Sequence, residues 1–148
     1  MKTYNILLNS NNRVAGTTVS TAKYYFDWYV MEEGEYTLSW GFACSNVDTT
    51  VNKVGLVSVS LGQSKNYMAT STNIRGMTTS VIGIIVPNEN DPSSFYYGDR
   101  NINGDIVLMR PTSNEFTVSI TTMDGLEWVD SVLAQMPEYS LSLTFTKL

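Results

Sequence analysis

One stretch of the chain, residues 24–45, constrains the fold most because it combines dense aromatic residues with strict alternation. In its second half, large apolar side chains occupy every other position: Tyr36, Leu38, Trp40 and Phe42. A period of two predicts a β-strand with one buried face. The Glu-Glu-Gly at 32–34 is typical of a hairpin turn in which glycine adopts a positive φ. The stretch therefore predicts an aromatic β-hairpin.

The first half of this hairpin, residues 24–31, carries aromatic rings on both faces. We expect one face to enter the core: Tyr24, Phe26, Trp28 and Val30. The residues of the opposite face are Tyr25, Tyr29 and Met31, with Asp27 among them. One core face does not need the second set of rings, so they favour contact with another molecule.

Other runs of alternating or continuous apolar residues predict further strands. They lie at residues 3–8, 54–61, 66–70, 81–86, 95–97, 106–110, 115–121 and 139–145. Residues 14–23, rich in threonine and serine, suit either an edge strand or a loop. Residues 124–136 break the pattern, because their apolar side chains have helical spacing between Asp124, a suitable N-cap, and Pro137, a helix stop. They predict one short helix.

These elements predict one all-β domain that spans residues 1–148. About eight or nine strands suit an antiparallel β-sandwich, and a single jelly roll fits both the number of strands and the length. We therefore predict a single jelly roll with one short helix near the C-terminus. An immunoglobulin-type sandwich is the alternative, although its Cys…Trp…Cys spacing is absent from a chain with 1 cysteine.

Composition narrows the functions that the chain can serve. A formal net charge of -5 disfavours nucleic-acid binding, and the absence of histidine removes the commonest general base and metal ligand. Cys44, at the end of the aromatic strand, is expected to be a small buried residue. No apolar run approaches the ~20 residues of a membrane helix, and the first residues do not resemble a signal peptide. We expect neither membrane association nor secretion by a leader.

The motifs that would carry chemistry are incomplete. Residues 99–104 match the first half of a calcium loop, but Arg110 stands where that loop requires a bidentate glutamate. We interpret the segment as an Asx-rich turn. The acidic residues around 32–35 cluster on one turn, whereas glycoside hydrolysis needs two carboxylates facing each other across a cleft. We therefore expect no enzyme activity, no cofactor and no metal site.

The remaining candidates are aromatic residues that the inward strand faces do not require or that lie in loops. They are Tyr25, Tyr29, Phe95, Tyr96 and Tyr97. We interpret them as contact residues of a protein interface. The alternative for the exposed aromatic residues is a platform that stacks on the apolar faces of sugars.

Several segments occur in an order that resembles a known family. They are YYFDW (24–28), EGEYTLSWGFACS (33–45), SVSLGQS (58–64), MRPTSNEFTVSI (109–120) and YSLSLTF (139–145). The order is similar to that of the single jelly-roll minor capsid and penton-type structural proteins of large DNA viruses. In that family an aromatic-Asp-Trp segment precedes a Gly-x-Tyr strand, and an R-P-x-x-N turn leads into a Phe-x-Val strand. No functional residue carries over, because these segments are scaffold.

The resemblance implies a structural virion protein, a minor capsid or penton subunit, that acts through protein–protein contacts. Its expected partners are other capsid proteins, above all the major capsid protein, and further copies of itself in a homo-oligomer. Such proteins contact neighbours through loops at the ends of the sandwich and through exposed strand edges. The expected location is the virion, after assembly in the host cytoplasm. A carbohydrate- or receptor-binding head domain on the same fold is the alternative.

Overall fold

The computed structural model describes residues 2–45, 55–61, 68–70, 79–87, 95–99, 105–122, 127 and 138–148. Strands dominate them: β1 (Thr3–Asn9), β2 (Thr21–Tyr25), β3 (Glu35–Ser45), β4 (Gly55–Val59), β5 (Met68–Thr70), β6 (Thr79–Pro87), β7 (Phe95–Gly98), β8 (Ile106–Met109), β9 (Glu115–Thr121) and β10 (Tyr139–Lys147). Two short 3-10 turns, η1 (Ser10–Asn12) and η2 (Trp28–Val30), follow β1 and β2.

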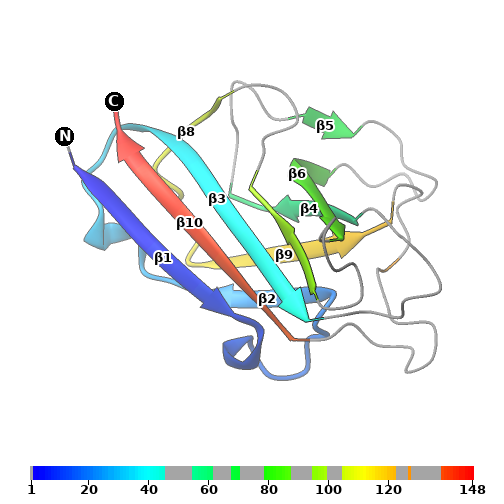
Figure 1. The fold of residues 1–148 in the computed structure, drawn as a ribbon. Coiled ribbons are helices and arrows are strands. Elements are labelled where there is room, and N and C mark those ends of the chain that lie inside the picture. Colours follow the sequence, from blue (N-terminus) through cyan, green and yellow to red (C-terminus); the bar gives the residue numbers. More distant parts are fainter. Residues whose placement is uncertain are drawn as a thin grey trace.

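The strands pair as a long hairpin that has been rolled up. Counting inward from the two ends of the chain, β1 pairs with β10, β2 with β9, β3 with β8 and β7, and β4 with β6, all antiparallel. Two further pairings, β10 with β3 and β9 with β4, join them into the sheets β1-β10-β3-β7 and β2-β9-β4-β6. Figure 1 shows the first sheet in front of the second. This nesting is the topology of a jelly roll, so the predicted fold is confirmed.

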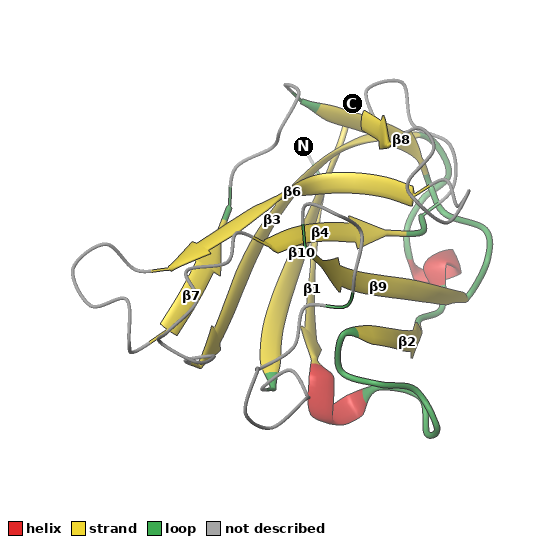
Figure 2. Ribbon diagram, turned by 90° about the vertical axis from the view of Figure 1, so that its right-hand side faces the viewer, coloured by secondary structure: helices red, strands yellow, loops and turns green. Residues whose placement is uncertain are grey.

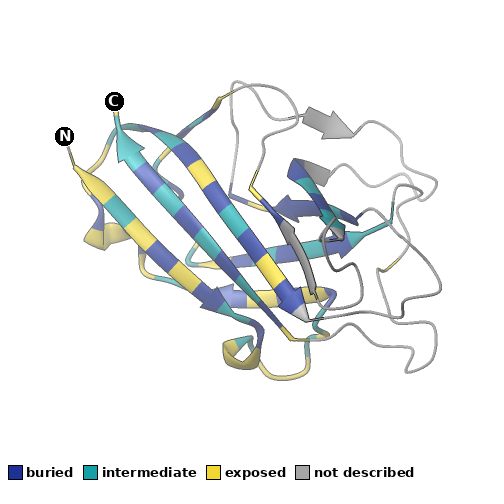
Figure 3. Ribbon diagram, viewed as in Figure 1, coloured by how far each residue is buried: buried dark blue, intermediate teal, exposed yellow. Residues whose placement is uncertain are grey.

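The core lies between the sheets and is lined by alternate residues of each. Buried and more accessible residues alternate along β1, β3 and β10, and Figure 3 shows the resulting bands. Trp40 and Cys44 are both 4% exposed, as predicted. The period-two pattern therefore identified the buried face of each of these strands correctly, because burial on one face is what generates the pattern.

The predicted hairpin between residues 24–31 and 35–43 is wrong. β2 and β3 lie in different sheets, and the connection between them crosses from one sheet to the other (Figure 2). The strand ends at Tyr25 because Asp27 caps a 3-10 turn: its carboxylate accepts the backbone N–H of Tyr29 at 3.0 Å. Gly34 does adopt a positive φ, 143°, but at the end of this crossing.

The 3-10 turn also changes which side chains face the core. Met31 is 1% exposed and Val30 is 62% exposed, the reverse of what alternation predicts. Tyr25 and Tyr29 are 70% and 65% exposed, so the outward placement predicted for both is confirmed.

Trp28 joins the two sheets from this connection. Its ring centroid lies 5.3 Å from that of Phe116 in β9 and 5.5 Å from that of Phe145 in β10, and Phe26 packs against it at 4.8 Å. The indole N–H donates to the carbonyl of Ser113 at 2.9 Å. The crossing segment is therefore anchored in the core by a fully buried ring whose polar atom has a partner.

The sandwich is closed along one side and open along the other. β6 and β7, from different sheets, pair at Val86 and Pro87. Gly98 lies beside this seam, where a Cβ would come within 2.3 Å of the carbonyl oxygen of Ile84. On the opposite side, β1 and β2 each end a sheet and do not pair with each other.

At two places the structure decides a local feature that the sequence pattern predicts wrongly or leaves undecided. Alternation along residues 54–61 predicts that Ser58 faces outward, but it is 5% exposed; the register of β4 against β6 shifts at this point, between Val57 and Ser58. Residues 14–20, left open between strand and loop, precede β2 as turns, and the strand begins at Thr21.

Two predicted features lie outside the described residues. Of the predicted helix at 124–136, only Glu127 is described, and it forms an isolated antiparallel bridge with Thr121. Of the loop at 99–104, only Asp99 is described, and it is exposed. The helix and the Asx-rich turn therefore stay predictions.

Candidate contact surface at one end of the sandwich

Two connections pack together at the end of the sandwich where both termini lie (Figure 1). One is the crossing from β2 to β3, and the other is the link from β8 to β9. The N–H of Phe26 donates to the carbonyl of Asn114 at 2.8 Å, and the N–H of Arg110 donates to the carbonyl of Gly34 at 3.0 Å. Hydrogen bonds at both ends of the crossing therefore hold it against the second connection.

Arg110 packs on the ring of Tyr29. Its guanidinium donates to the carbonyl of Met31 at 3.0 Å, and its central carbon lies 4.7 Å from the centroid of the Tyr29 ring. A cation over an aromatic face at an exposed site contributes about 0.5–1 kcal/mol. The contact thus favours one orientation of the phenol ring, although Tyr29 is 65% exposed.

Large exposed apolar side chains gather at this end. Among the described residues six are exposed, and five of them lie here: Tyr25, Tyr29, Val30, Met109 and Leu148. Met109 pairs with Glu35 at the start of β3, and the N–H of Leu148 donates to the carbonyl of Glu35 at 3.0 Å. We call these five residues the apolar end. A concentration of exposed apolar groups in one region is typical of a binding surface.

Charged groups border the apolar end. Glu32 forms ion pairs with Lys147, at 2.9 Å, and with Lys2. These side chains are about one third to two thirds exposed, so the pairs add little stability. A rim of charge around an apolar centre is the usual arrangement of a protein interface.

The other predicted contact residues lie elsewhere. Phe95, Tyr96 and Tyr97 belong to β7, which pairs with the Phe42–Ser45 part of β3, and their side chains are outside the described part of the structure. Tyr29 adjoins the opposite end of β3. The length of this strand, about 30 Å at the usual rise, separates the two groups. The five predicted residues therefore do not form one surface.

Sequence reasoning missed Val30, Met109, Leu148 and Arg110 as members of this end. Val30 was assigned inward by strand alternation, and Arg110 was considered only as an obstacle to calcium. The Asp at the start of the 3-10 turn, Asp27, was the local signal that alternation stops. Nothing in the sequence indicated that the start of β3 would gather the other three.

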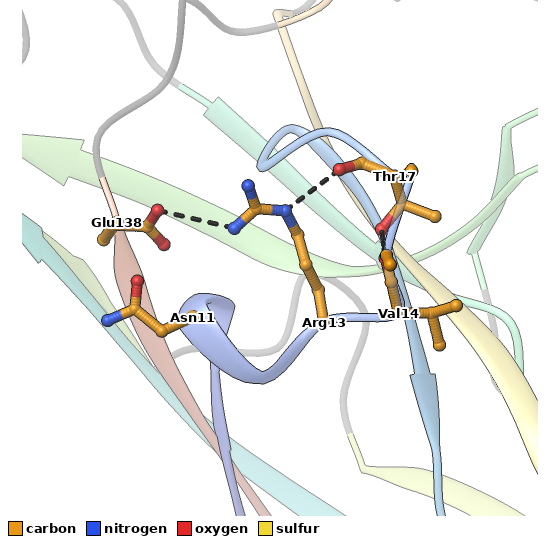
Figure 4. A pocket seen from close by; sticks show the side chains of 7 residues that line it. Asn11, Arg13, Val14, Thr17 and Glu138 are labelled. Atoms are coloured by element: carbon orange, nitrogen blue, oxygen red, sulfur yellow. Dashed lines mark hydrogen bonds and ion pairs between the residues drawn. The ribbon is translucent and has the colours of Figure 1, made fainter.

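A hollow lies beside η1 and the start of β10 (Figure 4). It has a volume of about 290 Å³, and Arg13 crosses it. The guanidinium donates to the carbonyls of Ser10 and Thr17 at 2.7 and 3.0 Å and pairs with Glu138 at 3.4 Å. These partners fasten the β1–β2 loop to β10, which is a structural role.

Tyr24 and Tyr139 form a buried pair of hydroxyls between the sheets. The Tyr24 hydroxyl donates to that of Tyr139 at 2.9 Å. Burial raises the pKa of both residues above the ordinary value for tyrosine, so both stay neutral well into the alkaline range. The pair stabilises the fold and offers no acid or base.

Within the described residues, no cluster of three or more Cys, Asp or Glu side chains is placed to hold a metal ion. No helix in this part of the chain combines the length and apolar character that a membrane span needs. No protein family model matches the sequence, and no curated protein matches it.

Proposed function

We propose that this chain is a structural subunit of a viral capsid, a minor capsid or penton protein, that packs its apolar end against neighbouring subunits. The jelly-roll topology agrees with the family that the sequence resembles. Fold alone does not assign function, so the proposal depends on the surface. Its partners are further copies of the chain and a major capsid protein, in the virion after assembly in the host cytoplasm.

Tyr29 is the observation that carries the proposal. The ring stands outward at the end of the sandwich, and Arg110 packs on it. Tyrosine and arginine dominate the residues that contribute most to protein interfaces. A ring with a favoured orientation in the free protein loses less conformational entropy when a partner covers it than a freely rotating ring does.

The available area supports a contact of useful strength. A tyrosine buries roughly 200 Å² when completely covered. Tyr25 and Tyr29, 70% and 65% exposed, each leave most of that area free. At about 25 cal/mol per Å², covering both stabilises an interface by roughly 5–7 kcal/mol before the costs of association.

Sedimentation velocity of the purified full chain over a range of concentrations tests the proposal. We expect oligomers for the wild type, and a shift towards monomer for Tyr29→Ala at an unchanged midpoint of unfolding. Tyr29→Phe is the matched control, because it keeps the ring and its cation contact and should assemble like the wild type. A wild type that is monomeric throughout, or a Tyr29→Ala variant that assembles normally, would contradict the proposal.

A carbohydrate-binding head is the second candidate, supported by the surroundings of the same rings. Arg110 covers one face of Tyr29, and the side-chain amide of Asn114 donates to the Tyr25 hydroxyl at 3.4 Å. A free ring face beside polar groups suits a sugar. A monomeric protein that binds glycans on an array, and loses this binding in Tyr29→Ala, would assign the apolar end to carbohydrate.

A further inference from the structure

The two strands that end the sheets, β1 and β2, differ in how far their outer edges are covered. The edge of β2 is covered by the preceding loop: the N–H of Val14 donates to the carbonyl of Lys23 at 2.7 Å, and the N–H of Lys23 donates to the Thr17 hydroxyl at 3.4 Å. β1 ends the other sheet and pairs only with β10 among the described strands. Within the described part of the chain, one edge is therefore protected and the other is open.

The register shows which backbone groups of β1 are free. The N–H of Lys147 donates to the carbonyl of Lys2 at 2.9 Å, so the even-numbered residues of β1 bond to β10. In an antiparallel ladder the intervening residues direct their N–H and C=O groups to the other side. Thr3, Asn5 and Leu7 therefore present unpaired backbone groups along the open edge.

β1 lacks the features that normally keep strand edges apart. Thr3–Asn9 contains no charged residue and no proline, and its register with β10 is continuous, without a bulge. Leu7 is 73% exposed, the highest value among the exposed large apolar residues described. A hollow of about 320 Å³ between β1 and residues 24–26 runs along the edge, so the approach to it is open.

We propose that β1 pairs antiparallel with β1 of a second copy, which joins two sandwiches through one continuous sheet about a two-fold axis. The register that pairs the whole strand places Thr3 opposite Asn9 and Asn5 opposite Leu7. Odd residues then meet odd residues, so free donors meet free acceptors on both copies. A two-fold contact requires such self-complementarity, which this strand has.

This register is also compatible with the charges near the two ends of β1. It places Lys2 of each copy opposite Ser10 of the other, and the Ser10 hydroxyl is hydrogen-bonded to the carboxylate of Glu138. Each of these charges already has a partner of opposite sign, Glu138 with Arg13 and Lys2 with Glu32, so the register brings no unpaired charges of one sign together. Each chain carries a net charge of -5, which makes two copies repel each other. Because β1 has no charged residue, two copies can approach along this strand without placing like charges of β1 opposite each other. Tyr25 of the apolar end also lines the hollow beside β1, but Tyr29 does not, so the Tyr29 variants separate this contact from the proposed function.

Leu7→Lys tests the edge, because it adds a charge to an exposed position and leaves the β10 ladder intact. Ser39→Lys is the matched control: Ser39 is exposed on the outer face of the same sheet, but it lies in β3, away from the edge. By sedimentation we expect a wild-type dimer whose dissociation constant rises about tenfold or more in Leu7→Lys and is unchanged in Ser39→Lys. Asn5→Pro, which removes an outward N–H together with the side chain that accepts from the Thr144 hydroxyl, should have the same effect as Leu7→Lys.

Residue-resolved hydrogen exchange gives an independent readout on the wild type. The amide of Ile6 should be protected at every concentration, because it bonds to β10, whereas the amides of Asn5 and Leu7 should gain protection as concentration rises. Rapid exchange of both amides at every concentration would refute the proposal. So would association that survives Leu7→Lys and Asn5→Pro but is lost in Tyr29→Ala, a result that supports the apolar end instead.

Discussion

Trp28 and Tyr29 are neighbours in the chain and should respond to truncation in opposite ways. Trp28 is fully buried between the two sheets, and Tyr29 is 65% exposed at the apolar end. Their side chains share one 3-10 turn, so a comparison of Trp28→Ala with Tyr29→Ala varies burial while the backbone element stays the same. The two variants together test whether Trp28 faces the core and Tyr29 faces outward in the connection between β2 and β3.

The structure predicts different losses in the free energy of unfolding for the two variants. Trp28→Ala removes a ring that packs on three aromatic residues and should lower the free energy of unfolding by about 3–5 kcal/mol. It also removes the donor to Ser113, which adds about 1 kcal/mol. Tyr29→Ala removes a mostly exposed ring and one cation contact, so about 1 kcal/mol or less is expected.

Urea unfolding of both variants, followed by circular dichroism, measures these differences. With a slope of about 1–3 kcal/mol per M, Trp28→Ala should lower the midpoint by about 1 M or more, and Tyr29→Ala by about a third of that shift or less. Tyr29→Ala should show its effect in assembly instead. Equal losses of stability in the two variants would refute the placement of the 3-10 turn.

Three further measurements test other parts of the structure. Gly98→Ala should destabilise the β6–β7 seam by about 1–3 kcal/mol or more, seen as a lower midpoint of unfolding, because its Cβ would meet the carbonyl oxygen of Ile84 at 2.3 Å; a neutral result would contradict the close approach. Trp40→Ala should cost about 3–5 kcal/mol in the same assay, since the ring is in the core; an unchanged midpoint would show that it is not. The raised pKa values of Tyr24 and Tyr139 predict that the stability they contribute is fully present below pH ~10, the unfolded-state value, and is lost as pH rises from there through the folded-state values. Each tyrosine should then lower the unfolding free energy by ~1.4 kcal/mol per pH unit, and Tyr139→Phe should flatten this decline.

The sequence predicted the outward placement of single residues correctly at Tyr25 and Tyr29. The exposure of Tyr25 and Tyr29 followed from their surplus over what one core face requires. The sequence did not indicate how far Tyr25 and Tyr29 lie from Phe95, which was assigned to the same set of contact residues. β7 and the 3-10 turn adjoin opposite ends of β3, which only the register of that strand reveals.

The amino-acid sequence by itself determined where most strands lie and which face of each is buried. Alternation is a local consequence of strand geometry, so Tyr36 through Phe42 could be assigned without any knowledge of their neighbours. Strand pairing is different, because hydrogen bonds between backbones are the same for any pair of strands. Only the tertiary structure decided that β2 crosses to the other sheet, that five apolar residues meet at one end, and that β1 keeps an open edge. These features depend on contacts between residues far apart in the chain, and no local pattern records them.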